Sequence, residues 1–139
     1  MNIHGHTIAI TGAGQGLGRT MAVELAKKGA RLAIIDLNPE PMQETQRLIS
    51  ALGGEARLYE CNVADEESVV ATFNAINEDF GGIHGLINNA GILRDGLFVK
   101  SKNDEITTMS LANWQMVIDV NLTGVFLCGR EAASHMVRN

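Results

Sequence analysis

Four glycines stand within eight residues near the start of the chain, in the run TGAGQGLG at 11–18. An ordered glycine loses more conformational entropy than any other residue, so the cluster indicates an unusual turn or a ligand lying against bare backbone. A strand-like run precedes the loop and a helical pattern follows it. Because a helix N-terminus presents free N–H groups and a partial positive charge, the loop predicts a pyrophosphate site. The candidate contacts are Gly12, Gln15, Gly16, Leu17 and Gly18.

An acidic residue, Asp36, ends the second strand-like run, RLAIID. A carboxylate at this place in a dinucleotide-binding fold accepts hydrogen bonds from a ribose diol and repels the 2′-phosphate of NADP. The next residue, Leu37, is apolar, so no cation stands beside the carboxylate to offset that repulsion. This pair therefore predicts NAD rather than NADP as the cofactor. The alternative for Asp36 is a simple role in capping the turn that follows.

A third feature is the run NNAG at 88–91, which ends the fourth strand-like run. Ligands of open α/β sheets bind beyond the carboxyl ends of the strands, near the point where the strand order reverses. Asn88 and Asn89 offer amide groups to neighbouring backbone, whereas Ala90 and Gly91 leave backbone bare beside a ligand. Elsewhere in a fold the same four residues would indicate no more than a turn.

Strand-like and helical patterns alternate along the chain as far as residue 91. Strands are predicted at 6–11, 31–36, 55–63 and 83–91, and helices at 16–30, 39–54 and 64–82. An irregular polar stretch over 92–110 precedes a helical pattern over 111–139, which is expected to break near Asn121 to Gly124. The alternation predicts an α/β fold, a three-layer doubly wound parallel sheet of Rossmann type with strand order 3-2-1-4. No linker or repeat divides residues 1–139, which are therefore predicted to form one domain.

Composition argues against several classes of function. The 139 residues carry a formal net charge of −5 and no cluster of Lys or Arg, which does not favour nucleic-acid binding. No apolar run has the length of a membrane span, and the N-terminus lacks a signal segment, so the interpretation is a cytoplasmic protein without a membrane partner. Cys61, Cys128 and the histidines have no metal-ligand spacing, and the cysteines are predicted to be reduced core thiols.

Together these motifs resemble the classical short-chain dehydrogenase/reductase family. They are TGxxxGxG after the first strand, an acid ending the second, NNAG ending the fourth and NLTG at 121–124. The run NNAGILRDG, followed by Trp114 and VIDVNLTGVF, is most similar to the 3-oxoacyl-(acyl-carrier-protein) reductases and their hydroxyacyl dehydrogenase relatives. The resemblance implies hydride transfer between a nicotinamide cofactor and a small-molecule ketone or secondary alcohol, with 3-oxoacyl thioesters as one candidate. Many fatty-acid reductases of the family use NADPH, and Asp36 departs from that branch. A flavodoxin-like or methyltransferase domain does not account for NNAG and NLTG together.

The resemblance also implies roles for individual residues. Asn62 and Val63 stand where the family usually has Asp-Val beside the adenine ring. The residues 89–91 match the cofactor-binding part of the strand-end motif, in which Asn88 is more structural. Asn121 matches the family's catalytic asparagine, which orders a water for proton relay. The alternative for Asn121 is a residue at a helix kink.

The family's proton-transfer residues have no counterpart in the chain. Its mechanism uses a tyrosine with a lysine four residues later, and a serine at the end of the next strand. The single tyrosine here, Tyr59, falls within the third predicted strand, and Val63 stands at the lysine position. The chain therefore looks like an N-terminal half, truncated before the fifth strand and predicted to be inactive alone. A non-catalytic NAD-binding module is the alternative.

Truncation would leave the fourth strand as a sheet edge and the last helix without a partner. That helix carries Val125, Phe126, Leu127 and Met136, and in the family it helps to form the dimer interface. A homo-oligomer through this helix is therefore expected. The stretch 92–110 is longer than the family's usual connection, and the residues 100–108 are predicted to be a solvated surface insertion.

Overall fold

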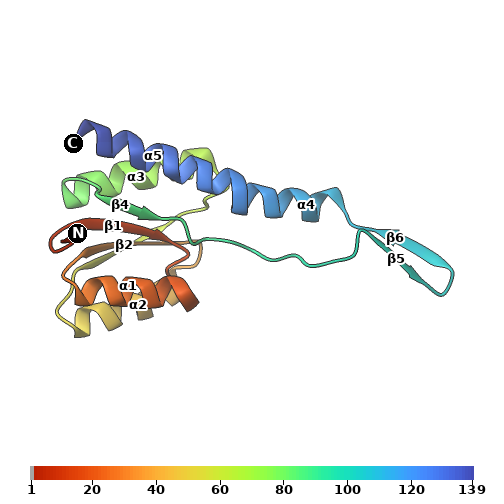
Figure 1. Ribbon diagram of the computed structural model, residues 1–139, viewed down its shortest axis with the longest axis horizontal. Coiled ribbons are helices and arrows are strands. Elements are labelled where there is room, and N and C mark those ends of the chain that lie inside the picture. Colours follow the sequence, from red (N-terminus) through yellow and green to blue (C-terminus); the bar gives the residue numbers. More distant parts are fainter. Residues whose placement is uncertain (1) are drawn as a thin grey trace.

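Four parallel strands form the central sheet of the computed structural model, which describes residues 2–139. The strands are β1 (Thr7–Thr11), β2 (Arg31–Asp36), β3 (Ala56–Glu60) and β4 (Gly85–Ile87), in the order β3-β2-β1-β4. Helices α1 (Gly16–Lys27) and α2 (Pro39–Ala51) cover one face, and α3 (Glu66–Phe80) and α5 (Gly124–Arg138) cover the other (Figure 1). The predicted α/β class, the three layers and the strand order 3-2-1-4 are confirmed.

The strand sequences explain why the sheet is buried on both faces. All five residues of β1 are buried, as are the four central residues of β2. Because successive side chains point to opposite faces, Ile10 and Ile34 belong to the core under α1 and α2. Ala9 and Ile35 belong to the core on the other side, where they lie with Phe73 of α3. Such nearly continuous apolar runs are what a parallel sheet covered by helices requires.

Helix ends follow local sequence signals. After α1 the chain turns at Gly29, whose φ of +81° is a left-handed conformation that favours glycine. Helix α3 begins at the N-cap Asp65, whose carboxylate accepts a hydrogen bond from the N–H of Glu67, and it ends at Gly81 with φ of +73°. The predicted ranges included such flanking residues, so the observed helices are slightly shorter. Among residues 2–139, no helix has the length and apolar character needed to cross a membrane.

Two strands are shorter than expected. Strand β3 covers 56–60 rather than 55–63, and β4 covers 85–87 rather than 83–91. Strand β4 lies at the sheet edge and pairs with β1 alone. It ends early because the backbone N–H groups of Asn89 and Ala90 both turn to the side-chain oxygen of Thr11, each at 3.0 Å, instead of continuing the ladder.

The last helical stretch is continuous, and where a break was predicted, near Asn121 to Gly124, the helix changes from α to π. Helix α4 (Leu111–Ile118) passes into α5 through a π-helical turn, η1 (Asp119–Thr123), in which the N–H of Gly124 donates to the carbonyl of Asp119. Gly124 lets α5 approach the chain that follows β3, because a Cβ there would lie 2.9 Å from a methyl of Val63. Turns of the π type are frequent at functional sites.

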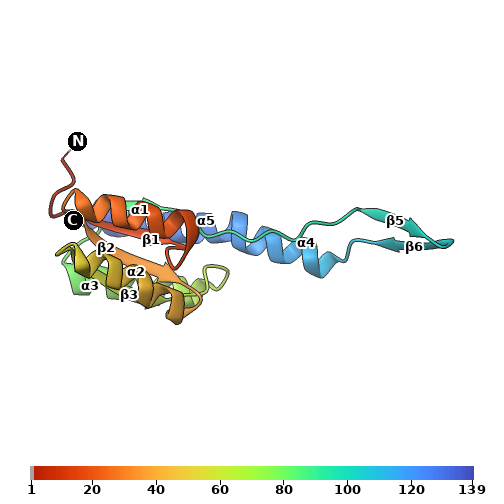
Figure 2. The same ribbon diagram turned by 90° about the horizontal axis from the view of Figure 1, so that it is seen from below.

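Residues 92–118 form an arm that projects from the body of the domain, which consists of residues 2–91 and 119–139 (Figures 1 and 2). The stretch 92–110 was expected to be irregular, but it contains an antiparallel hairpin of β5 (Val99–Lys102) and β6 (Glu105–Thr108). The two turn residues, Asn103 and Asp104, have φ of 51° and 61°, as a two-residue hairpin turn of type I′ requires. All residues of both strands are exposed, so the insertion is solvated as expected but ordered as a hairpin.

Candidate functional site

A cleft of about 380 Å³ opens where the strands of the sheet reach their carboxyl ends. Eleven of the twelve residues predicted to bind the cofactor line it, namely Gly12, Gln15, Gly16, Leu17, Asp36, Leu37, Asn62, Val63, Asn89, Ala90 and Gly91. The lining also includes Cys61, Ile92 and Val120, which sequence reasoning missed because each is an apolar or buried neighbour of a motif residue rather than part of it. The fold thus brings five distant segments of the chain together in one cleft.

The glycine loop owes its shape to two left-handed residues. Gly12 and Gly16 have φ of +67° and +56°. A Cβ on Gly12 would lie 2.9 Å from the Cα of Ala90, whereas a Cβ on Gly16 would face open space. The loop leads into α1, and within residues 2–139 the N–H groups of Gly16, Leu17 and Gly18 have no hydrogen-bond acceptor. Unpaired amides at a helix N-terminus are suited to an anionic group.

Gly18 is the predicted contact that does not line the cleft. It is buried beneath the loop, and a Cβ at this position would clash with the carbonyl oxygen of Gly12 and lie 2.7 Å from the amide nitrogen of Asn89. The third glycine of the motif therefore allows α1 to pack closely against the loop and the end of β4. The unpaired backbone N–H of Gly18 is the group through which this residue could contact a ligand.

The carboxylate of Asp36 lies at the edge of the cleft and is held by two backbone groups. Its Oδ2 accepts a hydrogen bond from the N–H of Gly14 at 2.8 Å, and its Oδ1 accepts one from the N–H of Leu37 at 2.8 Å. The second contact is the turn-capping role that the sequence left as an alternative. Because each carboxylate oxygen has a further lone pair, capping and the acceptance of ribose hydroxyls are compatible.

The NNAG run joins the end of β4 to the glycine loop. Thr11, which is almost fully buried, accepts from the N–H groups of Asn89 and Ala90, and the side-chain amide of Asn89 donates to the carbonyl of Gly12 at 3.1 Å. Sequence reasoning assigned no role to Thr11. The signal was its place directly before Gly12, at the last position of the first strand.

Asn62 and Cys61 line the cleft directly after the end of β3. The side-chain oxygen of Asn62, the residue expected beside the adenine ring, accepts from the N–H of Ala64 at 3.0 Å and so already takes part in a local turn. Cys61 is buried, and its sulfur contacts the hydroxyl of Ser68 at 3.6 Å. Burial, with a smaller effect from Cys61, raises the pKa of the nearby Cys128 to about 12. Both thiols are free and buried, as predicted.

Asn121 holds the segment that leaves the cleft. Its Oδ1 accepts from the N–H of Ile92 and its Nδ2 donates to the carbonyl of Ile92, both at 2.8 Å. The side-chain amide is therefore occupied by backbone. That Asn121 orders a water for proton relay stays a prediction. Asn121 lies within the π turn η1, so the turn presents its side chain to the segment after NNAG.

Comparison with known proteins identifies the family. Residues 6–139 match the family model described as short chain dehydrogenase. The chain belongs to the short-chain dehydrogenase family. The resemblance drawn from the sequence motifs is thereby confirmed.

Several short-chain dehydrogenases are similar to the chain. It is 36% identical over 130 residues to the 3-oxoacyl-(acyl-carrier-protein) reductase FabG of Staphylococcus aureus, covering 93% of this chain and 50% of that protein. It is 35% identical over 127 residues to 2,5-dichloro-2,5-cyclohexadiene-1,4-diol dehydrogenase of Sphingobium indicum, covering 91% and 47%. The chain spans about half the length of the curated relatives it matches.

Solved structures of short-chain dehydrogenases share the fold. A short-chain type dehydrogenase/reductase from Mycobacterium marinum superposes with a TM-score of 0.87 at 31% identity, covering 99% of this chain and 52% of that one. An NAD⁺-bound xylitol dehydrogenase superposes with a TM-score of 0.86 at 30% identity, covering 99% and 50%. The similarity therefore extends over the arm as well as the body.

Tyr59 is not placed to act as the proton donor of a short-chain dehydrogenase. It lies in β3, outside the cleft, and its hydroxyl donates to the carboxylate of Asp79 at 2.7 Å. Burial, together with the bond to Asp79, raises its pKa well above the usual value. A general acid near neutral pH needs the opposite shift. The prediction that Tyr59 is a strand residue is confirmed.

Proposed function

We propose that the chain is the NAD-binding part of an oxidoreductase that interconverts a ketone and a secondary alcohol. The observation that carries this proposal is one cleft holding both the unpaired amides at the start of α1 and the Asp36 carboxylate at the end of β2. The amides suit a pyrophosphate and the carboxylate suits a ribose diol, and a dinucleotide carries both groups. Membership of the short-chain dehydrogenase family and the NAD⁺-bound relative support the same conclusion.

Each part of the cleft has its own task in this proposal. The N–H groups of Gly16 and Leu17 bind the pyrophosphate, and Asp36 binds the adenosine ribose. Asn62 and Val63 lie beside the adenine, and the bare backbone of 89–91 lies along the other half of the dinucleotide. The bound nicotinamide would supply hydride chemistry, while the chain binds and orients it. Asn121 positions the backbone of the segment after NNAG through its paired hydrogen bonds to Ile92.

Cofactor choice follows from charge. The described residues that line the cleft include Asp36 and neither Lys nor Arg. A 2′-phosphate would lie beside the carboxylate without a compensating cation, and juxtaposed like charges are strongly unfavourable. NAD is therefore the proposed cofactor.

A titration of the protein with NAD and with NADP tests this choice. We expect NAD to bind at least about tenfold more tightly than NADP, because the penalty for juxtaposed like charges exceeds the roughly 1.4 kcal/mol that a factor of ten represents. Asp36→Ala should weaken NAD binding by roughly tenfold, the scale of a hydrogen bond to a charged group, and should bring the two affinities closer together. Glu60→Ala is the matched control, because Glu60 pairs with Asp36 in the β2–β3 register, is exposed and does not line the cleft. Tighter binding of NADP than of NAD by the unchanged protein would contradict the proposal.

The reaction itself needs residues that this chain does not contain. Tyr59 is bonded to Asp79, and no Tyr-x-x-x-Lys sequence is present. We therefore expect the 139-residue chain to bind NAD without reducing ketones in the presence of NADH. The chain is almost equally similar to a 3-oxoacyl reductase and to a cyclohexadienediol dehydrogenase, so the proposed substrate class is a ketone and alcohol pair rather than a specific thioester.

A further inference from the structure

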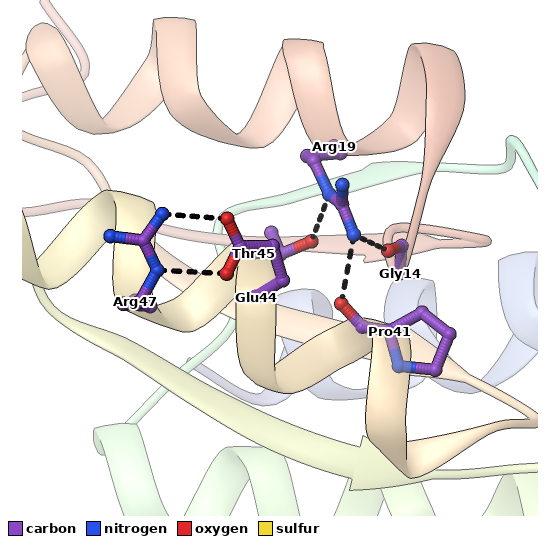
Figure 3. Close-up of polar contacts among 6 residues, drawn as sticks. All are labelled: Gly14, Arg19, Pro41, Glu44, Thr45 and Arg47. Atoms are coloured by element: carbon purple, nitrogen blue, oxygen red, sulfur yellow. Dashed lines mark hydrogen bonds and ion pairs between the residues drawn. The ribbon is translucent and has the colours of Figure 1, made fainter.

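Arg19 lies in the first turn of α1, just beyond the glycine loop, and its side chain is half-buried. Its guanidinium donates three hydrogen bonds (Figure 3). Nε donates to the hydroxyl of Thr45 at 3.1 Å, and Nη2 donates to the carbonyls of Gly14 at 2.6 Å and Pro41 at 3.1 Å. One side chain thus ties the glycine loop to the first half of α2. Arg19 itself does not line the cleft.

Thr45 extends this connection to the next peptide of the loop. Its fully buried hydroxyl donates to the carbonyl of Ala13 at 2.8 Å while it accepts from Arg19. The carbonyls of two consecutive loop residues, Ala13 and Gly14, are therefore both held on the α2 side. The N–H of Gly14 is held in turn by Asp36 Oδ2 at 2.8 Å.

These contacts fix the groups that the proposed function uses. Gly14 is packed so closely that a Cβ on it would lie 2.7 Å from Asp36 Oδ2, so the orientation of the carboxylate depends on where this peptide lies. The carbonyls of Ala13 and Gly14 are hydrogen-bonded to Thr45 and Arg19, respectively. Gly16 and Leu17, whose N–H groups are unpaired, come next in the loop and line the cleft. Arg19 acts on both features through Gly14.

The neighbouring arginine, Arg47, is bonded in a different way. It makes two hydrogen bonds to the carboxylate of Glu44, at 2.8 and 2.7 Å, and touches neither the loop nor the cleft (Figure 3). In the described part of the chain Arg19 has no carboxylate partner, and its acceptors are neutral oxygens. Its charge lies at the positive end of the α1 dipole and also helps, after Arg47, to lower the pKa of Glu44.

We propose that Arg19 is a positioning residue for the dinucleotide and sets its discrimination between NAD and NADP through Gly14 and Asp36. The inference rests on the proposed function, because it assigns Arg19 a role in that same site. Arg19 does not contact the ligand. It holds the glycine loop in its binding shape before the ligand arrives, which lowers the ordering cost of binding.

Titrations of Arg19→Met and Arg47→Met with NAD and NADP, each paired with urea unfolding, test the inference. Arg19→Met keeps the apolar stem and loses three hydrogen bonds, and we expect it to weaken NAD binding by about tenfold or more. The ratio of NAD to NADP affinity should also fall toward one, because Asp36 loses its fixed orientation. Arg47→Met should leave the NAD affinity and the ratio of NAD to NADP affinity within about twofold of their values in the unchanged protein, since surface ion pairs contribute little.

Two further variants keep the test decisive if Arg19→Met does not fold. Arg19→Lys retains the charge but cannot span three acceptors, so it should restore part of the affinity and little of the NAD preference. Thr45→Val should change the ratio in the same direction as Arg19→Met, and the two substitutions together should be less than additive because they break one network.

The possible failures are distinguishable. An Arg19→Met protein with unchanged NAD affinity and unchanged preference would overturn the positioning role and leave the proposed function intact. Equal losses of NAD and NADP affinity, with the ratio preserved, would also overturn it, because that is the signature of a general structural defect. An unchanged protein that binds neither dinucleotide would overturn the proposed function and this inference with it.

Discussion

In the body, the apolar side chains of the sheet are enclosed between two pairs of helices, whereas in the arm no residue of β5, β6 or α4 is buried. The arm exposes a set of large apolar side chains instead: Leu93, Leu97, Phe98, Val99, Ile106, Leu111, Trp114 and Met116. An isolated two-stranded hairpin is marginally stable in water, and monomeric proteins rarely expose large apolar patches. The body is therefore stabilised by its own core, whereas the arm has no core and carries the kind of apolar surface that is usually covered by a partner.

Two phenylalanines allow the contributions of the body and the arm to the free energy of unfolding to be compared. Phe73 in α3 is fully buried and Phe98 in the arm is 73% exposed. Phe73→Ala should lower the free energy of unfolding by about 3–5 kcal/mol, since it removes a core side chain and leaves a cavity. Phe98→Ala should lower it by less than about 0.5 kcal/mol, as for other surface positions. Urea unfolding of both variants at one protein concentration measures the two costs.

An unexpected result at Phe98 would be informative in a specific way. A loss comparable to that of Phe73→Ala would mean that the arm is covered in solution, and the comparison of body and arm would then hold for the isolated chain alone. The loss should in that case fall as the protein is diluted, because partners that bind the folded state stabilise it by mass action.

The same division separates what could be predicted from what could not. In the body, the apolar runs of β1 and β2, the capping residues and the glycine loop all point to one structure, and the sheet order followed from them. The eleven cleft residues followed from the glycine loop, from Asp36 and Leu37, from the NNAG run and, for Asn62 and Val63, from the family resemblance. In the arm, the turn uses Asn103 and Asp104 without glycine, so a hairpin with no buried face gave no periodic signal. The contacts of Asn121 and Arg19 were also unpredictable, because each depends on a backbone group brought near by the tertiary fold.

Helix α5, which follows α4 through η1, also exposes apolar side chains, and Phe126 is 60% exposed. We propose that the exposed apolar side chains of α5 mediate a homo-oligomer through this C-terminal helix. Phe126→Asp should shift the molar mass measured by light scattering after size exclusion toward that of a monomer, because a charge is costly in an apolar interface. Leu52→Asp is the control, since Leu52 is 50% exposed at the end of α2, outside the proposed interface. A monomeric unchanged protein would refute the proposal.

The smallest expected effect concerns a polar contact within the body. His84 donates its backbone N–H to the carbonyl of Thr7 at 2.9 Å and accepts the N–H of Thr7 on its ring Nδ1 at 3.0 Å, so its side chain extends the pairing of β1 and β4. The ring of His6 lies 4.7 Å away and the charge of Arg31 is near. Burial first, then His6 and Arg31, lowers the pKa of His84 from its usual value of 6.5. A lowered pKa means that folding favours the neutral ring, so this contribution is fully present above pH 6.5 and is lost as the pH falls through the lower folded-state pKa.

His84→Asn isolates this contribution, because the side-chain oxygen of asparagine can accept the same N–H without titrating. Between pH 7.5 and pH 5.0, we expect the unchanged protein to lose less than about 1 kcal/mol more stability than the variant, the scale of one hydrogen bond. Urea unfolding at both pH values gives the difference, and His6, present in both proteins, cancels in the comparison. A variant that loses as much stability as the unchanged protein would show that the edge of the body, like its centre, is held by burial and not by the His84 ring.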